Sequence, residues 1–138
     1  MKPIHQTLFG NGENGTQRGN CFAACIASLL ELPLEEVPNF CTKCDWREAA
    51  NLWLASRGLF YVDLKLPGDL RDEHVRFWGY HVISGMSVRN IRHSVVGFGG
   101  KTVFDPHPSG AGLIEGDWEY GFLIPQNPAR KNSRGTQT

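Results

Sequence analysis

The pattern of hydrophobic and polar residues predicts two helices in the first half of the chain. Residues 21–31, CFAACIASLLE, are apolar on most faces of a helix, which is typical of a buried central helix, and Pro33 ends it. Residues 45–58, DWREAANLWLASRG, carry apolar side chains at helical spacing. Asp45 is the expected N-cap of this second helix, and Gly58 is the expected C′ residue that stops it.

The second half of the chain changes to short apolar runs that are rich in β-branched and aromatic residues and are separated by glycine and proline. The expected strands lie within residues 59–66, 79–87, 91–100, 101–108 and 118–125. A hairpin turn is expected near Gly99 and Gly100. Two helices followed by four to five antiparallel strands predict an α+β fold.

Length and composition indicate one globular domain. The chain has 138 residues, of which 41% are hydrophobic and 20% charged. We expect a single domain over residues 1–125 and a polar, disordered tail over residues 126–138. Lys plus Arg and Asp plus Glu both number 14, so the net charge is zero. This balance argues against a dedicated nucleic-acid partner or a polybasic membrane surface.

The N-terminal segment MKPIHQTLFGNG lacks the apolar run of a signal peptide, and no segment approaches the roughly 20 apolar residues that cross a bilayer. We therefore expect a cytoplasmic protein without a membrane partner. Disulfides rarely persist in that compartment, so the cysteines are interpreted as thiols or ligands. They are Cys21, Cys25, Cys41 and Cys44.

Cys21 begins the predicted central helix directly after Gly19 and Asn20. A cysteine within a helix often serves as small core filler. At a helix N-terminus, however, the helix dipole stabilises a thiolate, which is the reactive form of a nucleophile. Cys25, one turn further along the same helix, is interpreted as packing or as a redox partner of Cys21.

His93 and Asp105 make the nucleophile hypothesis stronger. His93 starts one predicted strand and Asp105 ends the next, twelve residues later, so a hairpin can bring them side by side. An imidazole beside a thiol stabilises the thiolate and supplies a proton to the leaving group, and a carboxylate orients the imidazole. His107, two residues after Asp105, is a rival base.

Two segments, GNCFAACIASLL and RHSVVGFGGKTVFDPHPSG, resemble the papain-like cysteine peptidase superfamily. The chain looks closest to proteins similar to the peptidases that remove double-glycine leaders from bacteriocins, and similar short chains occur in phage and bacterial genomes. The resemblance covers most of residues 17–124. It implies a papain-like fold in which the nucleophile helix packs on an antiparallel sheet, with Cys21 as nucleophile, His93 as base and Asp105 as orienting residue.

The family places a glutamine shortly before the cysteine, where its side chain and the cysteine N–H stabilise the oxyanion. Two glutamines qualify, Gln6 and Gln17. We prefer Gln6, because the loop NGENGT lets it fold back toward Cys21. The chain has Asn20-Cys21-Phe22 where the peptidases tend to have Asp-Cys-Gly, a departure that bears on the substrate more than on the fold.

Two further patterns remain open. Cys41 and Cys44 have the spacing of half a zinc site, to be completed by two ligands from Cys25, His5, His74 or His81. Arg89 and Arg92 precede His93; they are solvated surface charges, or they bind a carboxylate or phosphate of the substrate.

These observations predict a cysteine hydrolase that cleaves an amide or peptide bond through a thiol acyl-enzyme and needs no cofactor. The substrate would be a peptide or a small amide. Two alternatives stay open: acyl transfer of the transglutaminase type, and a non-catalytic papain-like domain that binds a peptide or small ligand and interferes with another factor.

Overall fold

The computed structural model describes residues 1–13, 18–67 and 79–127. Within these residues it contains two helices and a five-stranded antiparallel sheet, which confirms the α+β class. The spatial order of the strands is β1-β5-β2-β3-β4. The elements are α1 (Cys21–Leu30), α2 (Trp46–Ala55), β1 (Leu59–Leu66), β2 (Tyr80–Met86), β3 (Arg92–Phe98), β4 (Lys101–Phe104) and β5 (Trp118–Pro125), with 3-10 turns at Leu34–Glu36 and Phe40–Thr42.

Helix α1 is the buried central helix that its composition predicts. Seven consecutive residues, from Phe22 to Ser28, are buried. The helix ends at Leu30, and its C-cap Glu31 adopts a left-handed conformation with φ of 57°. An all-apolar helix is stable only inside a core, so α1 is fixed in position by its packing rather than by its propensity.

Helix α2 confirms Asp45 as N-cap, since the Asp45 carboxylate accepts a hydrogen bond of 3.2 Å from the Glu48 N–H. The C-terminus differs slightly from the expectation, because Ser56 is the C-cap and Gly58 lies two residues beyond it. The last turn tightens as the N–H groups of Arg57 and Gly58 bond three residues back. Gly58 then reverses the chain with φ of +73°.

The strands fall where the apolar runs predict them, and β1 and β5 match their runs residue for residue. The β3–β4 turn uses Gly99 and Gly100, whose φ values of 63° and 87° suit a type I′ hairpin. The β3–β4 ladder is irregular. Gly97 pairs with Thr102 but Val96 pairs with Phe104, so Val103 is an extra residue, a β-bulge.

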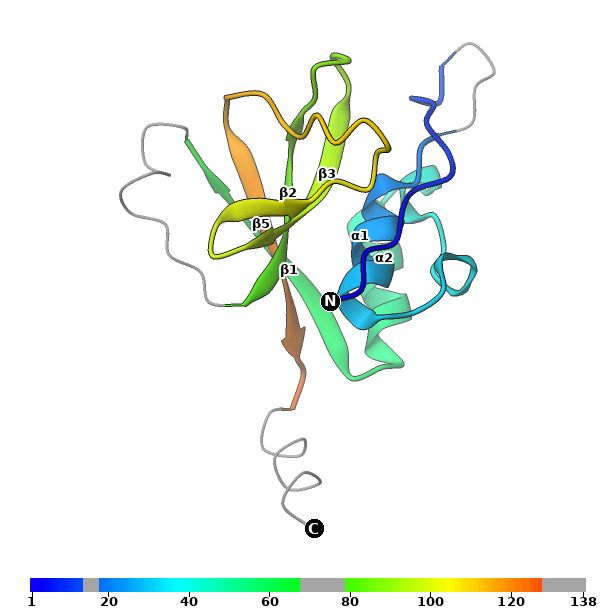
Figure 1. Cartoon of the computed structure of the whole chain (residues 1–138). Helices are drawn as coiled ribbons and strands as arrows, with labels where there is room; N and C mark the ends of the chain where they lie inside the picture. Colours follow the sequence, from blue (N-terminus) through cyan, green and yellow to red (C-terminus); the bar gives the residue numbers. More distant parts are fainter. Residues whose placement is uncertain (14–17, 68–78, 128–138) are drawn as a thin grey trace.

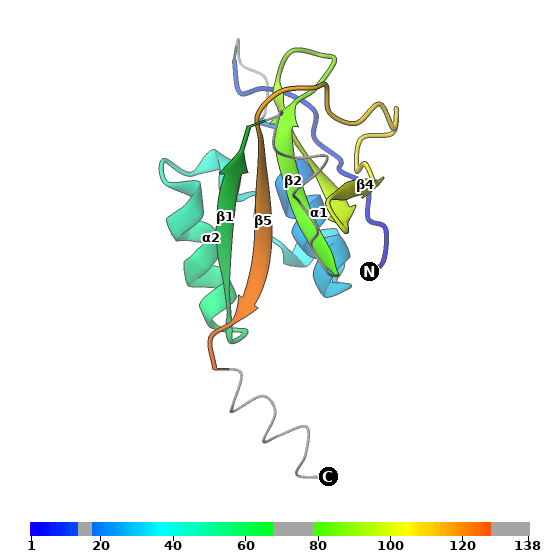
Figure 2. The same ribbon diagram turned by 90° about the vertical axis from the view of Figure 1, so that its left-hand side faces the viewer.

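Both helices cover one face of the sheet, α1 over β3 and β2 and α2 over β1 (Figures 1 and 2). The main core lies between them and includes Phe22, Ile26, Tyr61, Val82 and Val96. A smaller cluster on the other face gathers around Ile83, Val95 and Tyr120. This arrangement brings the N-terminus of α1 to the first residues of β3.

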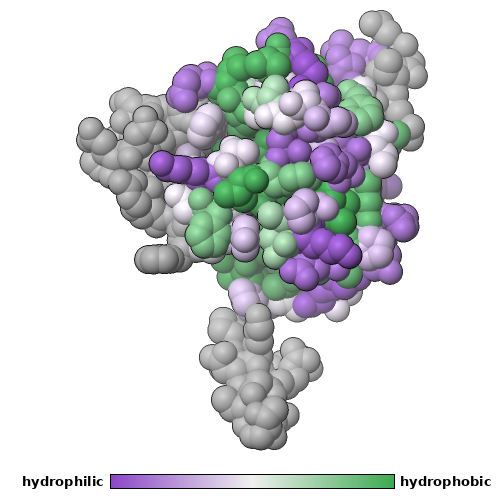
Figure 3. Space-filling view, in the orientation of Figure 1, coloured by the Kyte–Doolittle hydropathy of each residue, from purple (hydrophilic) through white to green (hydrophobic). Residues whose placement is uncertain are grey.

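The surface mixes hydrophilic and hydrophobic residues on the face shown in Figure 3. No helix among the described residues combines the length and the apolar composition needed to span a bilayer. Most of the expected tail, residues 128–138, lies outside the described residues, as do residues 68–78.

Candidate active site

Cys21 is the first residue of α1, and the Asn20 side chain before it does not cap the helix. The first N–H groups of a helix have no partner within the helix, and Asn is normally among the best residues for satisfying them. The first turn of α1 also contains no acidic residue. The N–H groups and the positive end of the helix dipole are therefore left for another group beside Cys21.

The Asn20 amide instead holds the segment of residues 6–10, which we call the N-terminal strap. Asn20 Oδ1 accepts hydrogen bonds from the N–H groups of Thr7, at 3.0 Å, and Leu8, at 2.9 Å. Asn20 Nδ2 donates to Thr7 Oγ1 at 3.0 Å. Asn20 is buried, and these three partly buried bonds tie the strap to the start of α1.

Gly19, which precedes Asn20 and Cys21, packs closely against the strap. Its N–H donates to the Gly10 carbonyl at 2.6 Å, so the strap and this residue lie backbone to backbone. A Cβ atom on Gly19 would lie 3.1 Å from the Gly10 oxygen and 3.2 Å from the Leu8 oxygen. Such contacts are tighter than Cβ atoms usually make, so a side chain at this position would push the strap away by a few tenths of an ångström.

His93, on β3, and Asp105, directly after β4, form a buried hydrogen-bonded pair with 2.6 Å between His93 Nε2 and Asp105 Oδ1. The carboxylate also accepts bonds from the His107 N–H, at 2.9 Å, and from the Gly112 N–H, at 2.7 Å. Three donors therefore hold Asp105, and Asp105 in turn holds the His93 ring.

The electrostatics favour a charged pair. Burial lowers the pKa of His93, but its hydrogen bonds to Asp105 and to the Cys21 thiol outweigh burial and raise the pKa to about 9. Burial raises the pKa of Asp105, but the bonds from His93, His107 and Gly112 outweigh it and lower the pKa to about 2. His93 is thus an imidazolium at neutral pH, and Asp105 is a carboxylate.

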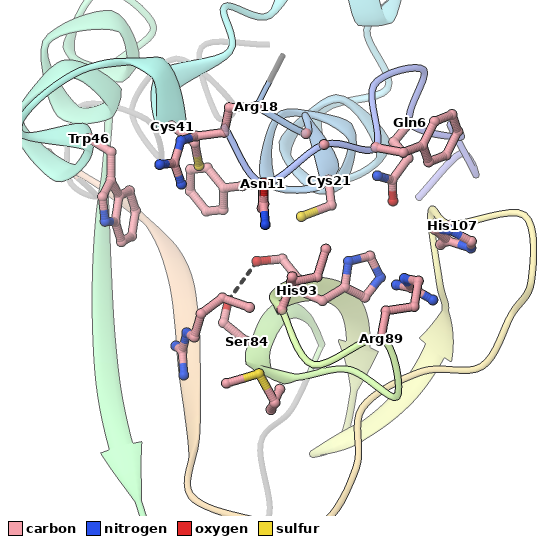
Figure 4. A pocket seen from close by; sticks show the side chains of 18 of the residues that line it. Gln6, Asn11, Arg18, Cys21, Cys41, Trp46, Ser84, Arg89, His93 and His107 are labelled. Carbon is pink, nitrogen blue, oxygen red and sulfur yellow. Dashed lines mark hydrogen bonds between the residues drawn. The ribbon is translucent and has the colours of Figure 1, made fainter. Parts of the chain in front are cut away.

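Cys21 and His93 face each other across the cleft (Figure 4). The Cys21 thiol lies close enough to His93 to help raise the pKa of the ring. Since His93 Nε2 is bound to Asp105, Nδ1 is the ring nitrogen left for the sulfur. The expected nucleophile, base and orienting residue therefore come together in one place.

Gln6 lies on the strap, beside Cys21 and His93 (Figure 4). It is only 6% exposed, and its backbone N–H donates to the Pro106 carbonyl at 3.0 Å. Gln6 Nε2 donates to the Leu8 carbonyl at 2.9 Å, which leaves its second hydrogen for another acceptor. Gln6 Oε1 has no hydrogen-bond partner among the described residues. The rival Gln17 lies outside the described residues.

The site opens into a cleft of about 940 Å³. Besides Gln6, Cys21 and His93, its lining includes the aromatic side chains of Phe9 and Trp46 and the hydroxyls of Ser84 and Ser94, which bond to each other at 2.7 Å. A volume of this size suits a peptide segment or a small molecule. Asn20, Ser84 and Trp46 carry no signal of their own in the sequence and were not among the predicted site residues.

His107 lines the cleft, but it does not replace His93 beside Asp105. Its Nδ1 lies 2.8 Å from the Ser109 hydroxyl, and its ring centroid is 6.2 Å from that of His93. Burial and the nearby charge of Arg89 lower the pKa of His107, so its ring is neutral at pH 7.

The other cysteines differ from Cys21 in their surroundings. Burial, with the charge of Cys21, raises the pKa of Cys25 far above its usual range. Burial likewise raises the pKa of Cys41 to about 11, whereas Cys44 is exposed. Within residues 1–13, 18–67 and 79–127, no three His, Cys, Asp or Glu side chains converge as a metal site requires. Among the expected additional zinc ligands, His74 lies outside those ranges.

Comparison with known proteins gives no significant match to any family model, curated protein or solved structure. The functional assignment therefore depends on the geometry of the site itself.

Proposed function

We propose that the protein is a cysteine hydrolase of the papain-like type that cleaves an amide or peptide bond through a thioester intermediate. The observation that carries this proposal is the position of His93, which bonds to Asp105 and lies beside the Cys21 thiol at the wall of an open cleft. A nucleophile, a base and an orienting carboxylate in this order form the catalytic arrangement of thiol hydrolases.

In the first half of the reaction, a Cys21 thiolate attacks the carbonyl carbon of the substrate and forms a C–S bond, and the carbonyl electron pair moves onto oxygen. The Cys21 N–H, at the uncapped start of α1, and the free hydrogen of Gln6 Nε2 stabilise this oxyanion. When the carbonyl re-forms, the C–N bond breaks and the amine takes the proton from His93. An acyl-thioester on Cys21 remains.

In the second half, a water molecule gives a proton to the neutral His93 as its oxygen attacks the thioester. The tetrahedral adduct then releases the Cys21 thiolate and the acid, which restores the starting ion pair. Asp105 stays ionised throughout, because three hydrogen-bond donors and a pKa of about 2 stabilise its charge. If an amine takes the place of water, the same steps give acyl transfer.

The test is the rate of alkylation of Cys21 by iodoacetamide, followed residue by residue by mass spectrometry. We expect fast reaction of Cys21 at about pH 6, because an adjacent imidazolium stabilises the thiolate, and loss of at least about tenfold in His93→Ala. Cys44 is exposed and serves as a reference thiol in the same sample. Incubation with a mixed peptide library, with Cys21→Ala as control, then reports cleavage.

One observation favours a non-catalytic peptide-binding domain as the second candidate. The Gln6 amide already bonds to the Leu8 carbonyl, and its buried Oε1 has no partner in the described part of the chain, as expected of a group that accepts a hydrogen bond from a bound ligand. In that case Cys21 would react no faster than Cys44, and ligand binding would persist in Cys21→Ala.

A further inference from the structure

The cleft concentrates positive charge on a chain whose net charge is zero. Its lining contains four arginines and two glutamates. Two of the arginines are neutralised. Arg47 bonds to Asp63 at 2.6 Å and to Glu119 at 3.1 Å, and Arg92 bonds to Glu119 at 3.4 Å. Arg92 is therefore a weaker candidate than Arg89 for binding an anion of the substrate.

Arg18 and Arg89, at opposite ends of the cleft, form no ion pair with any residue that the structure describes (Figure 4). Arg18 is exposed, so water solvates its charge. Arg89 is half-buried, and the one hydrogen bond that its guanidinium makes within the described residues goes to the uncharged Ser109 hydroxyl, at 3.4 Å. Of the two arginines without an ion pair, Arg89 is the less exposed and therefore the better placed to bind an anion of a ligand.

The backbone around Arg89 is held in one conformation. Ser87 is buried, its N–H and its hydroxyl both donate to the Ile91 carbonyl at 3.0 Å, and the Asn90 N–H donates to the Ser87 carbonyl at 3.0 Å. Asn90 takes the left-handed conformation, with φ of 62°, that closes this turn. A fixed turn means that no further backbone ordering is needed when Arg89 binds a ligand.

Arg89 is also connected to the reacting groups through two side chains, Ser109 and His107. It bonds to Ser109, Ser109 bonds to His107 at 2.8 Å, and the His107 and His93 rings are 6.2 Å apart. Figure 4 shows Arg89 reaching into the cleft beside His93 and His107. His107 is neutral at pH 7, so of these two neighbouring side chains only Arg89 carries a positive charge.

We infer that Arg89 binds a carboxylate of the substrate, next to the bond that Cys21 attacks. This inference rests on the proposed function and adds the substrate class, an acidic peptide or amide. One guanidinium matches the two oxygens of one carboxylate, with charge and geometry both satisfied. A doubly charged phosphate would call for more donors than this end of the cleft provides.

The test compares iodoacetate with iodoacetamide as alkylating reagents of Cys21. The two deliver nearly the same group, but only iodoacetate carries a carboxylate. We expect Arg89→Gln to lower the ratio of the iodoacetate rate to the iodoacetamide rate by about three- to tenfold, the size of one unscreened charge interaction at short range. Arg89→Lys, which keeps the charge, should retain most of the ratio, and added salt should reduce it.

Arg57→Gln is the matched control, because it removes the same charge from a residue that stacks on Trp53 and does not line the cleft. Its ratio should equal that of the wild type. An unchanged ratio in Arg89→Gln overturns the inference, even when iodoacetamide reacts fast. Slow reaction of Cys21 with iodoacetamide in the wild type instead overturns the proposed function, so the two failures are distinguishable.

Protection experiments identify the source of the carboxylate. N-acetylaspartate amide carries it on a side chain and N-acetylglycine carries it at the chain end, whereas N-acetylasparagine amide is neutral. Each compound is added at millimolar concentration, and the rate of iodoacetamide reaction at Cys21 is measured. Slower reaction with N-acetylaspartate amide supports a side-chain carboxylate, and slower reaction with N-acetylglycine supports a terminal one. In either case the neutral amide should give no protection, and Arg89→Gln should abolish the protection by the acid. Equal protection by all three compounds overturns the inference.

Discussion

His93 and Asp105 lie on the same side of the β3–β4 ladder because Val103 is an extra residue between them. In an unbroken ladder that continues from Gly97 and Thr102, Asp105 would lie opposite Ser94 and point to the other side from His93. After the bulge the register moves by one residue. The pairing ends at Val96 and Phe104, and the same register continued by one residue puts Asp105 opposite Val95, on the side of His93, where their 2.6 Å hydrogen bond forms.

The first prediction concerns Asp105→Asn. The amide cannot stabilise a charged ring, so we expect the pKa of His93 to fall from about 9 toward or below its ordinary value, since burial lowers it. The alkylation rate of Cys21 at about pH 6 should drop by about tenfold or more, because less imidazolium is present to support a thiolate.

The control for this variant is Asp45→Asn, which removes the same charge outside the cleft and keeps an equally good N-cap for α2. Its alkylation profile should match that of the wild type. A wild-type rate at about pH 6 in Asp105→Asn would show that the carboxylate does not act on Cys21 through His93.

The second prediction is the pH dependence of stability. The folded-state pKa of His93 is raised, so its contribution is full below about 6.5 and is lost as the pH rises through about 9. The folded-state pKa of Asp105 is lowered, so its contribution is full above about 4 and is lost as the pH falls through about 2. The pair is therefore most stabilising between about pH 4 and 6.5.

Urea unfolding of the wild type and of Asp105→Asn, measured from below about pH 2 to above about pH 9, tests this pH dependence. We expect the free energies of unfolding to differ by about 1–3 kcal/mol within the window, as for a buried charge-assisted hydrogen bond. The difference should shrink above pH 9 and below pH 2. A difference that is constant with pH would mean that the bond does not couple to the ionisation of either group.

The third prediction concerns Asn20→Ala, which removes the three hydrogen bonds that hold the strap. We expect a loss of about 1–3 kcal/mol in the free energy of unfolding, because two backbone N–H groups are left without a partner. Amide hydrogen exchange at Thr7 and Leu8 should become faster, which reports release of the segment that carries Gln6.

Asn51→Ala gives the matched control. The Asn51 side chain also bonds to backbone groups, the N–H and carbonyl of Tyr61, at 2.6 and 3.4 Å. This variant should lose comparable stability, yet exchange at Thr7 and Leu8 should stay slow. Equal exchange in both variants would mean that Asn20 has no special role in positioning the strap.

Much of the fold follows from local patterns in the sequence. Helix α1 and strands β1 and β5 are distinct apolar runs with proline or glycine boundaries, so their bounds are predictable to within a residue. The closeness of His93 and Asp105 also follows from hairpin geometry. The bulge at Val103 does not, because an extra residue in a ladder depends on packing across strands and leaves no mark in a run of four residues.

The wider site depends on contacts between distant segments. Asn20 bonds to residues twelve and thirteen positions earlier, and Arg92 pairs with Glu119, 27 residues later. The hydrophobic pattern around Asn20 and Arg92 does not indicate which distant residue each of them contacts. For the same reason the sequence offers Arg89 and Arg92 as equal candidates for a substrate anion, whereas their partners in the structure separate them.

The last prediction tests the bulge directly by deletion of Val103. Without this residue Phe104 follows Thr102 directly, so the Gly97–Thr102 and Val96–Phe104 pairs form a regular ladder, and Asp105 keeps the register that puts it on the side of His93. Val103 is exposed, so its removal takes little from the core, and circular dichroism should still report a folded α+β protein. Alkylation of Cys21 at about pH 6 should therefore stay close to the wild-type rate and well above the rate of Asp105→Asn. Val103→Thr, which keeps the extra residue and its β-branched shape, should also react like the wild type. Alkylation of the folded deletion variant as slow as that of Asp105→Asn would show that the local twist of the bulge, rather than the register, sets the position of Asp105.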